Sequence, residues 1–369
     1  MSTSSSFNPN DATSISSHPV QRVPYPSAIT FPAPLQPGDR IALTAPSSGV
    51  RADLHQLVYR MRDYLTELGY EPVIGDSMWT NYKCVSLPKA ERAAELERYL
   101  LDEEIKAIIP PWGGEFLMEL LPLLNWERIR HLPPKWILGF SDISTLTFAY
   151  TLQTGYGSAH GPSGVDIAQS KDETTSRWHD LLTAASGQSI EQSSSAMYQS
   201  TADYSRAGFT LDAPTRWDWL GHEQQSDEEL TVSGRLIGGC LDVLAALVGT
   251  PWARVTDFIQ QYGEQDGMIW YLESCELNAG AIYRHLWQMR QAGWFQHTHA
   301  VLIGRPAGYE PLQEFELIDA LHMVFDELNI PVVYGVDIGH IPPQITMING
   351  ALAKVHVQNG SGTVTQTLA

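Results

Sequence analysis

The 369-residue chain is poor in cysteine and has no long apolar run. Its three cysteines, Cys84, Cys240 and Cys275, have neither the even count of a disulfide framework nor the spacing of a metal site. This usage indicates a reducing compartment, so we expect a cytoplasmic protein. No segment is apolar over the length of a membrane span, and the first residues lack the apolar core of a signal peptide.

Positive charge is also scarce. Lysine and arginine number 23 against 42 aspartates and glutamates, which gives a formal net charge of −19, and no basic cluster interrupts the acidic pattern. This balance argues against nucleic acid or an anionic membrane as the partner. The chain also lacks an HExxH motif, and Gly238-Gly239 lacks the lysine and the spacing of a phosphate loop. We therefore expect neither a metal nor a nucleotide cofactor.

Strand and helix patterns alternate along the first part of the chain. Strands are predicted at residues 40–45, 106–111 and 136–140, and helices at 54–68 and from residue 88. This alternation predicts an α/β fold with a mostly parallel sheet covered on both faces. Further on, the pattern predicts a helix that opens at 234–242 and runs to Val248, strands at 268–273 and 300–305, and a helix at 282–291.

Composition divides the chain into four parts. We expect a disordered tail over residues 1–27, an N-terminal α/β domain over 28–168, a linker over 169–230 and a C-terminal domain over 231–369. The linker is rich in Ser, Thr, Gln, Asp and Glu, and Trp178, Trp217 and Trp219 are predicted to anchor it locally.

One turn in the first domain has the sequence pattern of a nucleophile elbow but no nucleophile. A β-branched run leads into Gly113 and Gly114, and a helix pattern follows at once, which predicts exposed backbone N–H groups at a helix N-terminus. Leu117 stands where a serine is expected, and leucine cannot attack a carbonyl carbon. Glu115 is the only reactive side chain on the turn; it is either a general acid or base, or a carboxylate stabilised by the helix dipole.

Two later segments carry an acid and a histidine. Glu273 ends an apolar strand, where an isolated carboxylate would be costly, and His340 is its natural partner. Gly339 and the following Ile-Pro-Pro predict that the His340 imidazole is exposed on a loop. The order of elbow, acid and histidine is that of a Ser-Glu-His triad hydrolase.

Several spaced motifs together resemble the LD-carboxypeptidase family of serine peptidases, from about Leu35 to the C-terminus. The motifs are Pro37-Gly38-Asp39, Ala45-Pro46-Ser47, Gly113-Gly114, Gly139-Phe140-Ser141-Asp142, His160-Gly161-Pro162, Gly238-Gly239, Leu272-Glu273, Tyr283-Arg284 and Gly339-His340. The resemblance implies an N-terminal domain similar to glutamine amidotransferases, a smaller swivelling-barrel-like C-terminal α/β domain, an active site between them, and a homodimer. It also gives Glu273 and His340 the acid and base roles, and it implies an oxyanion hole formed by the N–H groups of Gly114 and Met118.

Each of the other polar candidates has two possible interpretations, one functional and one structural. Asp142, after Ser141, is a helix N-cap or a site residue, and His160 is a pocket residue or a turn residue. Glu276 and Arg284 bind a substrate carboxylate or amine, or they form an interdomain salt bridge. Cys240 and Cys275 are expected to be small core residues rather than nucleophiles. The substrate-binding candidates are Gly113, Gly114, Leu117, Met118, Ser141, Asp142, His160, Glu276 and Arg284.

The sequence thus predicts a hydrolase that acts on a small peptide-like or amide-bearing substrate. His340 would be the general base and Glu273 would orient it, with Glu115 as a third catalytic group and with water or the substrate replacing the serine. A catalytically silent binding homologue, an enzyme of different chemistry, and a serine peptidase whose nucleophile lies elsewhere are the alternatives.

Overall fold

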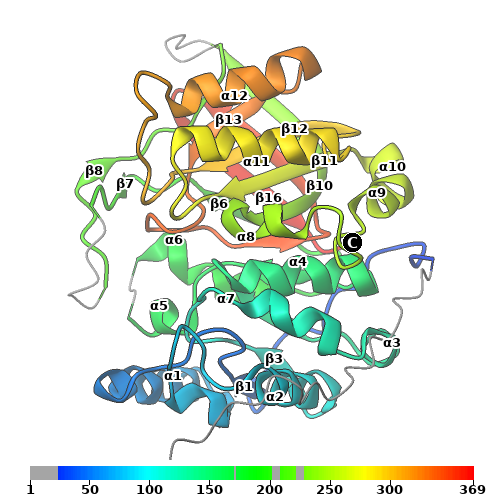
Figure 1. Cartoon of the computed structure of the whole chain (residues 1–369), viewed down its shortest axis with the longest axis vertical. Coiled ribbons are helices and arrows are strands. Elements are labelled where there is room, and N and C mark those ends of the chain that lie inside the picture. The colour runs from blue at the N-terminus through cyan, green and yellow to red at the C-terminus, as the bar shows by residue number, and fades with distance from the viewer. Residues whose placement is uncertain (1–23, 170–171, 202–207, 222–227) are drawn as a thin grey trace, which may run out of the picture.

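The computed structural model describes residues 24–169, 172–201, 208–221 and 228–369. Two sheets are stacked one above the other, with the first half of the chain mostly in the lower part of Figure 1 and the second half mostly in the upper part. Residues 1–23 of the expected disordered tail lie outside the described residues. Its last part is packed, because the Tyr25 ring lies 5.7 Å from that of Phe258 and 5.8 Å from that of Tyr262. Among the described helices, none is long and apolar enough to span a membrane.

The first sheet has six strands in the order β14-β5-β4-β3-β1-β2. Their bounds are β1 Arg40–Leu43, β2 Glu71–Ile74, β3 Ile105–Ile108, β4 Trp136–Gly139, β5 Ser158–His160 and β14 Met347–Asn349. Strands β1 to β5 are parallel, and β14 pairs antiparallel with β5. The three strands predicted in this part of the chain are confirmed, and so is the α/β class.

The second sheet has eight strands in the order β6-β16-β15-β10-β11-β12-β13-β9. Their bounds are β6 Ser189–Ser193, β9 Asp218–Trp219, β10 Glu229–Cys240, β11 Met268–Glu273, β12 Thr298–Gly304, β13 Val332–Val336, β15 Leu352–Gln358 and β16 Ser361–Thr367. Strands β10 to β13 are parallel, and the remaining strands pair antiparallel with their neighbours. A separate two-stranded sheet pairs β7 Met197–Tyr198 with β8 Ala213–Pro214.

Helices connect and cover the strands. The α-helices are α1 His55–Glu67, α2 Lys89–Leu101, α3 Trp126–Ile129, α4 Ile143–Thr154, α5 Gly164–Gln169, α6 Glu173–Ser176, α7 Trp178–Leu182, α8 Leu241–Leu244, α9 Val255–Phe258, α10 Glu264–Asp266, α11 Ala279–Gln291 and α12 Leu317–Phe325. The 3-10 segments are Ala52–Leu54, Asp76–Trp79, Leu117–Leu123, Ala245–Leu247 and Asp326–Leu328, and Ile259–Gly263 is a π-helical turn. The helices predicted at 54–68, from 88 and at 282–291 correspond to α1, α2 and α11.

Helix α4 joins the two halves of the molecule. All twelve of its residues are buried, as expected for a helix without a polar face. It packs against β10 and α8 of the second half, and Figure 1 shows it at the boundary between the two sheets. Its N-terminal end at Asp142 therefore lies where the two halves meet.

The segment 169–230 is not an extended linker over its described residues. Trp178 in α7 is buried in the core of the first half, whereas Trp217 and Trp219 are buried in the second, so the predicted anchors are present. Strands β6 and β9 form the two edges of the second sheet. Polar edge strands gave the sequence its linker-like composition; for example, the Gln192 side chain hydrogen-bonds the backbone of Thr346 in both directions, at 2.7 and 3.0 Å. The domain limits at 28–168 and 231–369 stay a prediction.

The helix predicted from Gly234 is wrong, because β10 continues to Cys240 and α8 begins only at Leu241. A Cβ atom on Gly238 would lie 1.8 Å from the carbonyl oxygen of Tyr271 on β11. The glycine is therefore required by a close approach of two central strands rather than by a helix start.

Candidate active site

The elbow differs from the predicted strand-turn-helix. No helix begins at Gly114; a 3-10 helix, here called η3, begins three residues later at Leu117 and ends at Leu123 with Pro122 inside it. Gly114 has a φ of +147°, and a Cβ there would lie 2.3 Å from the hydroxyl of Ser47. The loop after β1 therefore closes directly onto the glycine turn.

Asp142 fastens this turn. It holds the N-cap position of α4, but its buried carboxylate does not cap the helix. The carboxylate instead accepts hydrogen bonds from the Ser47 hydroxyl at 2.5 Å and from the Leu117 N–H at 2.9 Å. Burial raises the pKa of Asp142, and the bonds from Ser47 and Leu117 partly offset that effect. Ser141 beside it has a positive φ of 60°, and its side chain fills the space next to Gly113.

Leu117, at the expected nucleophile position, is a core residue. Its side chain is fully buried and belongs to the same hydrophobic cluster as Leu120 and Leu121. The flanking Phe116 and Met118 are exposed to 39% and 41%. The Leu117 side chain is thus closed off from solvent, and its neighbours supply the apolar surface of the elbow.

Glu273 and His340 form a buried pair. Glu273 is the last residue of β11, His340 lies in the loop after β13, and Nδ1 of His340 is 2.7 Å from Oε2 of Glu273. The predicted exposed imidazole is wrong, since the His340 side chain is only 9% exposed. The Phe140 ring lies 4.8 Å from the imidazole and covers it.

The backbone around His340 explains this burial. Gly339 has a φ of +93°, and a Cβ there would lie 2.4 Å from Oε2 of Glu273. Asp337 is fully buried and accepts hydrogen bonds from Arg305 and from the Trp217 indole, each at 2.8 Å. The Asp337 carboxylate therefore anchors this loop. The loop has room for the Glu273 side chain only because residue 339 is glycine.

The two groups of the pair stabilise each other's charged form. Burial alone would raise the pKa of Glu273, but the charge and the hydrogen bond of His340 lower it below its ordinary value. Burial alone would lower the pKa of His340, but the charge of the Glu273 carboxylate and its hydrogen bond raise it well above its ordinary value. The pairing therefore favours the carboxylate form of Glu273 and the imidazolium form of His340.

His160 is a strand residue beside Glu273 rather than a turn residue. It ends β5, is fully buried, and its Nε2 lies 3.9 Å from Oε1 of Glu273. Its Nδ1 lies 3.2 Å from the hydroxyl of Ser144, which in turn accepts the Cys240 N–H at 3.0 Å. Burial lowers the pKa of His160 to about 4, so the ring is neutral at pH 7. Ser144 is fully buried and engaged in this network, which excludes it as a free nucleophile.

Carboxylates gather where the elbow faces the loop after β11. Burial, and then the charges of Glu276, Asp142 and Asp242, raise the pKa of the exposed Glu115. Asp242 accepts the N–H groups of Cys275 and Glu276 at 3.1 and 2.9 Å. The structure therefore brings Glu115 and Glu276 to the same place, from opposite halves of the molecule.

Arg284 does not join this group. It is exposed on α11, and among the described residues it makes no ion pair with Glu276 or with any other carboxylate. The interdomain salt bridge considered for Glu276 and Arg284 is thus absent from the described residues.

The sequence patterns missed Cys240, Asp242 and Ser144 as neighbours of the site. The Cys240 sulfur, a Glu273 oxygen and a His340 nitrogen all lie within 4.8 Å of one another, the only such group of potential metal ligands among the described residues. Oε2 of Glu273 is bonded to Nδ1 of His340 at 2.7 Å, whereas the buried Oε1 has no hydrogen-bond partner. Residues 240, 273 and 340 are too far apart in the chain for any spacing rule to join them.

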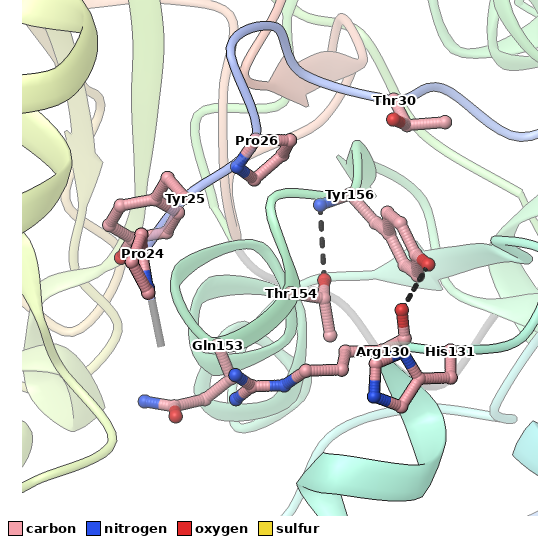
Figure 2. A pocket seen from close by; sticks show the side chains of 9 residues that line it. All are labelled: Pro24, Tyr25, Pro26, Thr30, Arg130, His131, Gln153, Thr154 and Tyr156. Carbon is pink, nitrogen blue, oxygen red and sulfur yellow. Dashed lines mark hydrogen bonds between the residues drawn. The ribbon is translucent and has the colours of Figure 1, made fainter. Parts of the chain in front are cut away.

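A cavity of about 350 Å³ lies elsewhere (Figure 2). It is lined by Tyr25, Arg130, Gln153 and Tyr156, among others, and by none of the predicted site residues. Gln153 is near the C-terminal end of α4, whereas Asp142 precedes its first residue. A helix of this length spans about 18 Å, so the cavity is remote from the Glu273–His340 pair.

The architecture is that of a two-part α/β protein, with a bonded acid and histidine at the ends of strands of its second sheet. Models of the LD-carboxypeptidase N-terminal domain and of the LD-carboxypeptidase C-terminal domain match residues 41–161 and 233–355. The chain belongs to the LD-carboxypeptidase family, a family of peptidases. The predicted resemblance is confirmed.

Individual relatives are similar over nearly their whole length. The murein tetrapeptide carboxypeptidase of Pseudomonas aeruginosa is 26% identical over 83% of this chain and 89% of its own. The microcin C7 self-immunity protein MccF of Escherichia coli is 23% identical over 90% of this chain and 95% of its own. The solved structure of an MccF-like protein from Bacillus anthracis matches with a TM-score of 0.76 at 23% identity, over 92% of this chain and 99% of that chain, which shows that the fold is shared.

Proposed function

We propose that the protein hydrolyses an amide bond in a small peptide-like substrate, and that His340 and Glu273 carry the proton transfers. The observation that supports this most is the 2.7 Å bond between the two side chains, buried where the elbow of one half meets the β11 loop of the other. Relatives named as a murein tetrapeptide carboxypeptidase and a microcin self-immunity protein support a peptide-like substrate.

The geometry divides the roles. Because Glu273 takes Nδ1 of His340, the Nε2 atom is the one left for proton exchange with the substrate. The imidazolium donates a proton to the leaving amine, and the N–H groups of Gly114 and Met118 would stabilise the oxyanion, as the family resemblance implies. Leu117 supplies no nucleophile, so the attacking group must come from another part of the site.

The rim of the site favours a substrate with a cationic group. The charges of Glu276, Asp142 and Asp242 act on Glu115 at the elbow, and the exposed Phe116 and Met118 provide an apolar surface beside it. Carboxylates gathered at one place attract a cation and repel an anion. We therefore include an ammonium group, such as a free amine of a peptide, in the proposed substrate class.

Incubation with a panel of LD-linked muropeptides and peptidyl-adenylate analogues, followed by mass spectrometry, tests the proposal. We expect amide cleavage by the wild type, and losses of about a thousandfold or more in kcat/KM for His340→Ala and Glu273→Gln. His131→Ala is the matched control, since that histidine is 71% exposed and remote from the pair. Equal rates for His340→Ala and His131→Ala would refute the assignment.

The buried Leu117 favours a second candidate, a binding protein without turnover. Such a protein would retain ligand-dependent thermal stabilisation and cleave no member of the panel, in the wild type and in His340→Ala alike.

The homodimer and the cytoplasmic location are part of our proposal as well; sedimentation equilibrium of the full chain and fractionation of the producing cells test them.

A further inference from the structure

The cavity of about 350 Å³ at the C-terminal end of α4 is lined by a buried arginine. The Arg130 side chain is only 8% exposed, and Figure 2 shows it extending toward Gln153 among the lining residues. Pockets that bind small molecules usually have volumes of about 300 to 1,000 Å³. The cavity thus has room for a small molecule beside a positive charge.

The backbone of Arg130 is fixed on both sides. Its N–H group closes the end of α3 by donating to the carbonyl oxygens of Trp126 and Arg128. Its own carbonyl oxygen accepts the Tyr156 hydroxyl at 2.6 Å. The guanidinium group therefore starts from a defined point on the wall of the cavity.

The guanidinium group of Arg130 has more hydrogen-bond donors than partners. Its Nε donates to the Trp126 carbonyl oxygen at 3.4 Å, which is a long bond. Within the described part of the chain, its two amino groups donate no hydrogen bond. Buried donors without acceptors are costly, and the two amino groups form a planar fork that matches the two oxygens of a carboxylate.

Three hydroxyl groups that line the cavity are already bonded to the protein. Tyr25 and Thr154 each donate to a carbonyl oxygen of α4 at 2.6 Å, and Tyr156 donates to two carbonyl oxygens of the segment after α3. Pro24 and Pro26 complete this side of the cavity, so that rings supply much of its surface. The lining therefore combines unused cationic donors with apolar walls.

The neighbouring charges leave Arg130 available. The closest approach of Glu127 is 3.8 Å, to Nε, and this carboxylate is 58% exposed and bonded to His131 at 3.0 Å on the outside. Such exposed pairs contribute little. The second arginine of this region, Arg254, is paired with Asp257 at 3.0 Å. One unbalanced positive charge thus faces the cavity.

We propose that this cavity binds a small organic carboxylate, with the amino groups of Arg130 bonded to the two carboxylate oxygens and the rings around the apolar body of the ligand. One arginine balances a single negative charge, and the net charge of −19 disfavours a dianion such as a phosphate monoester. The site is remote from the Glu273–His340 pair, and the inference does not rest on the proposed function.

Calorimetric titration of the full chain with benzoate at pH 7 tests the proposal. Benzamide is the control of matched shape without charge, and phenyl phosphate is the dianionic control. We expect one benzoate to bind per chain, at least about tenfold more tightly than either control, because the charge-assisted bonds are lost or the added charge is repelled. No saturation by millimolar benzoate, or equal binding of benzamide or phenyl phosphate, would overturn the proposal.

Variants of α3 and of its last turn locate the bound benzoate. Arg130→Gln should bind it at least about tenfold more weakly, and Arg130→Lys, which keeps the charge and loses the fork, should lie between this variant and the wild type. Arg128→Gln is the matched control, since Arg128 is exposed on the same helix and is not part of the cavity. Wild-type affinity in Arg130→Gln would overturn the assignment.

Amide hydrogen exchange of the wild type locates the ligand without any variant, and it decides the matter if Arg130→Gln does not fold. Benzoate should slow exchange in the peptides that contain Arg130 and Thr154, on two sides of the cavity. Protection that is confined to other peptides, or no protection at a saturating concentration, would overturn the proposal.

Discussion

Replacing Leu117 by serine places a hydroxyl at the position predicted for the family nucleophile, and we expect a less stable protein without serine peptidase activity. The Leu117 side chain is fully buried among Leu120, Leu121 and other apolar residues, and its N–H is held by Asp142. A serine there has its hydroxyl in the core rather than on an accessible surface.

The size of the effect follows from this burial. Truncating a buried leucine to alanine costs about 3 kcal/mol of unfolding free energy through lost burial and a residual cavity. A buried hydroxyl without a partner adds about 1 to 3 kcal/mol. Leu117→Ser should therefore be destabilised by about 4 to 6 kcal/mol, and Leu117→Ala by about 3 kcal/mol.

Thermal unfolding and labelling with a serine-directed phosphonate check this expectation. Leu120→Ser is the matched control, because that leucine is equally buried on the same 3-10 helix. We expect similar losses of stability for the two serine variants and no phosphonate adduct on either. A stable Leu117→Ser protein that carries the phosphonate on its introduced serine would show that position 117 faces the site, and the core assignment would be wrong.

Three further substitutions test how the site is held. Gly339→Ala places a Cβ 2.4 Å from Oε2 of Glu273, so we expect about a hundredfold loss of kcat/KM with an unchanged far-ultraviolet circular dichroism spectrum; wild-type activity would contradict the geometry. Asp337→Asn removes the buried charge that pairs with Arg305 at 2.8 Å, and calorimetry should show that the free energy of unfolding falls by about 3 to 5 kcal/mol. An unchanged melting temperature would contradict a stabilising role of this ion pair. Glu115 has a raised pKa in the folded chain, so its ionisation destabilises the fold as pH rises from about 4 to 7. The melting temperature of Glu115→Gln minus that of the wild type should accordingly increase over this range, and a constant difference would contradict the shift.

The regular elements were predictable where burial and periodicity agree. Strand 268–273 is fully buried and uniformly apolar up to its final glutamate, and it appears with the same bounds as β11. The helix predicted from Gly234 failed because Gly238 and Gly239 interrupt an apolar run in the manner of a turn, although they permit close strand contact. The prediction of a linker over residues 169–230 was wrong because an edge strand exposes polar side chains on one face, so its composition is indistinguishable from that of a loop.

The site residues were predictable only where the local sequence around a residue identified it. Glu273 and His340 were paired from the sequence because each sits in a distinctive local context, and their contact is confirmed at 2.7 Å. The burial of the His340 side chain was not predicted from the sequence, because it depends on contacts with Phe140 and on the loop around Asp337. The approach of Cys240 to Glu273 and His340 was not predicted either, because it brings together three segments that are far apart in the chain.

The course of the chain near its C-terminus sets a limit on how the two halves move. After β13 in the second sheet the chain enters the first sheet as β14, which pairs with β5 next to His160, and it then returns to the second sheet as β15. A hinge motion between the halves would have to break the pairing of β14 with β5. Access of substrate to the Glu273–His340 pair therefore depends on side chains and loops near the pair rather than on movement of one half against the other.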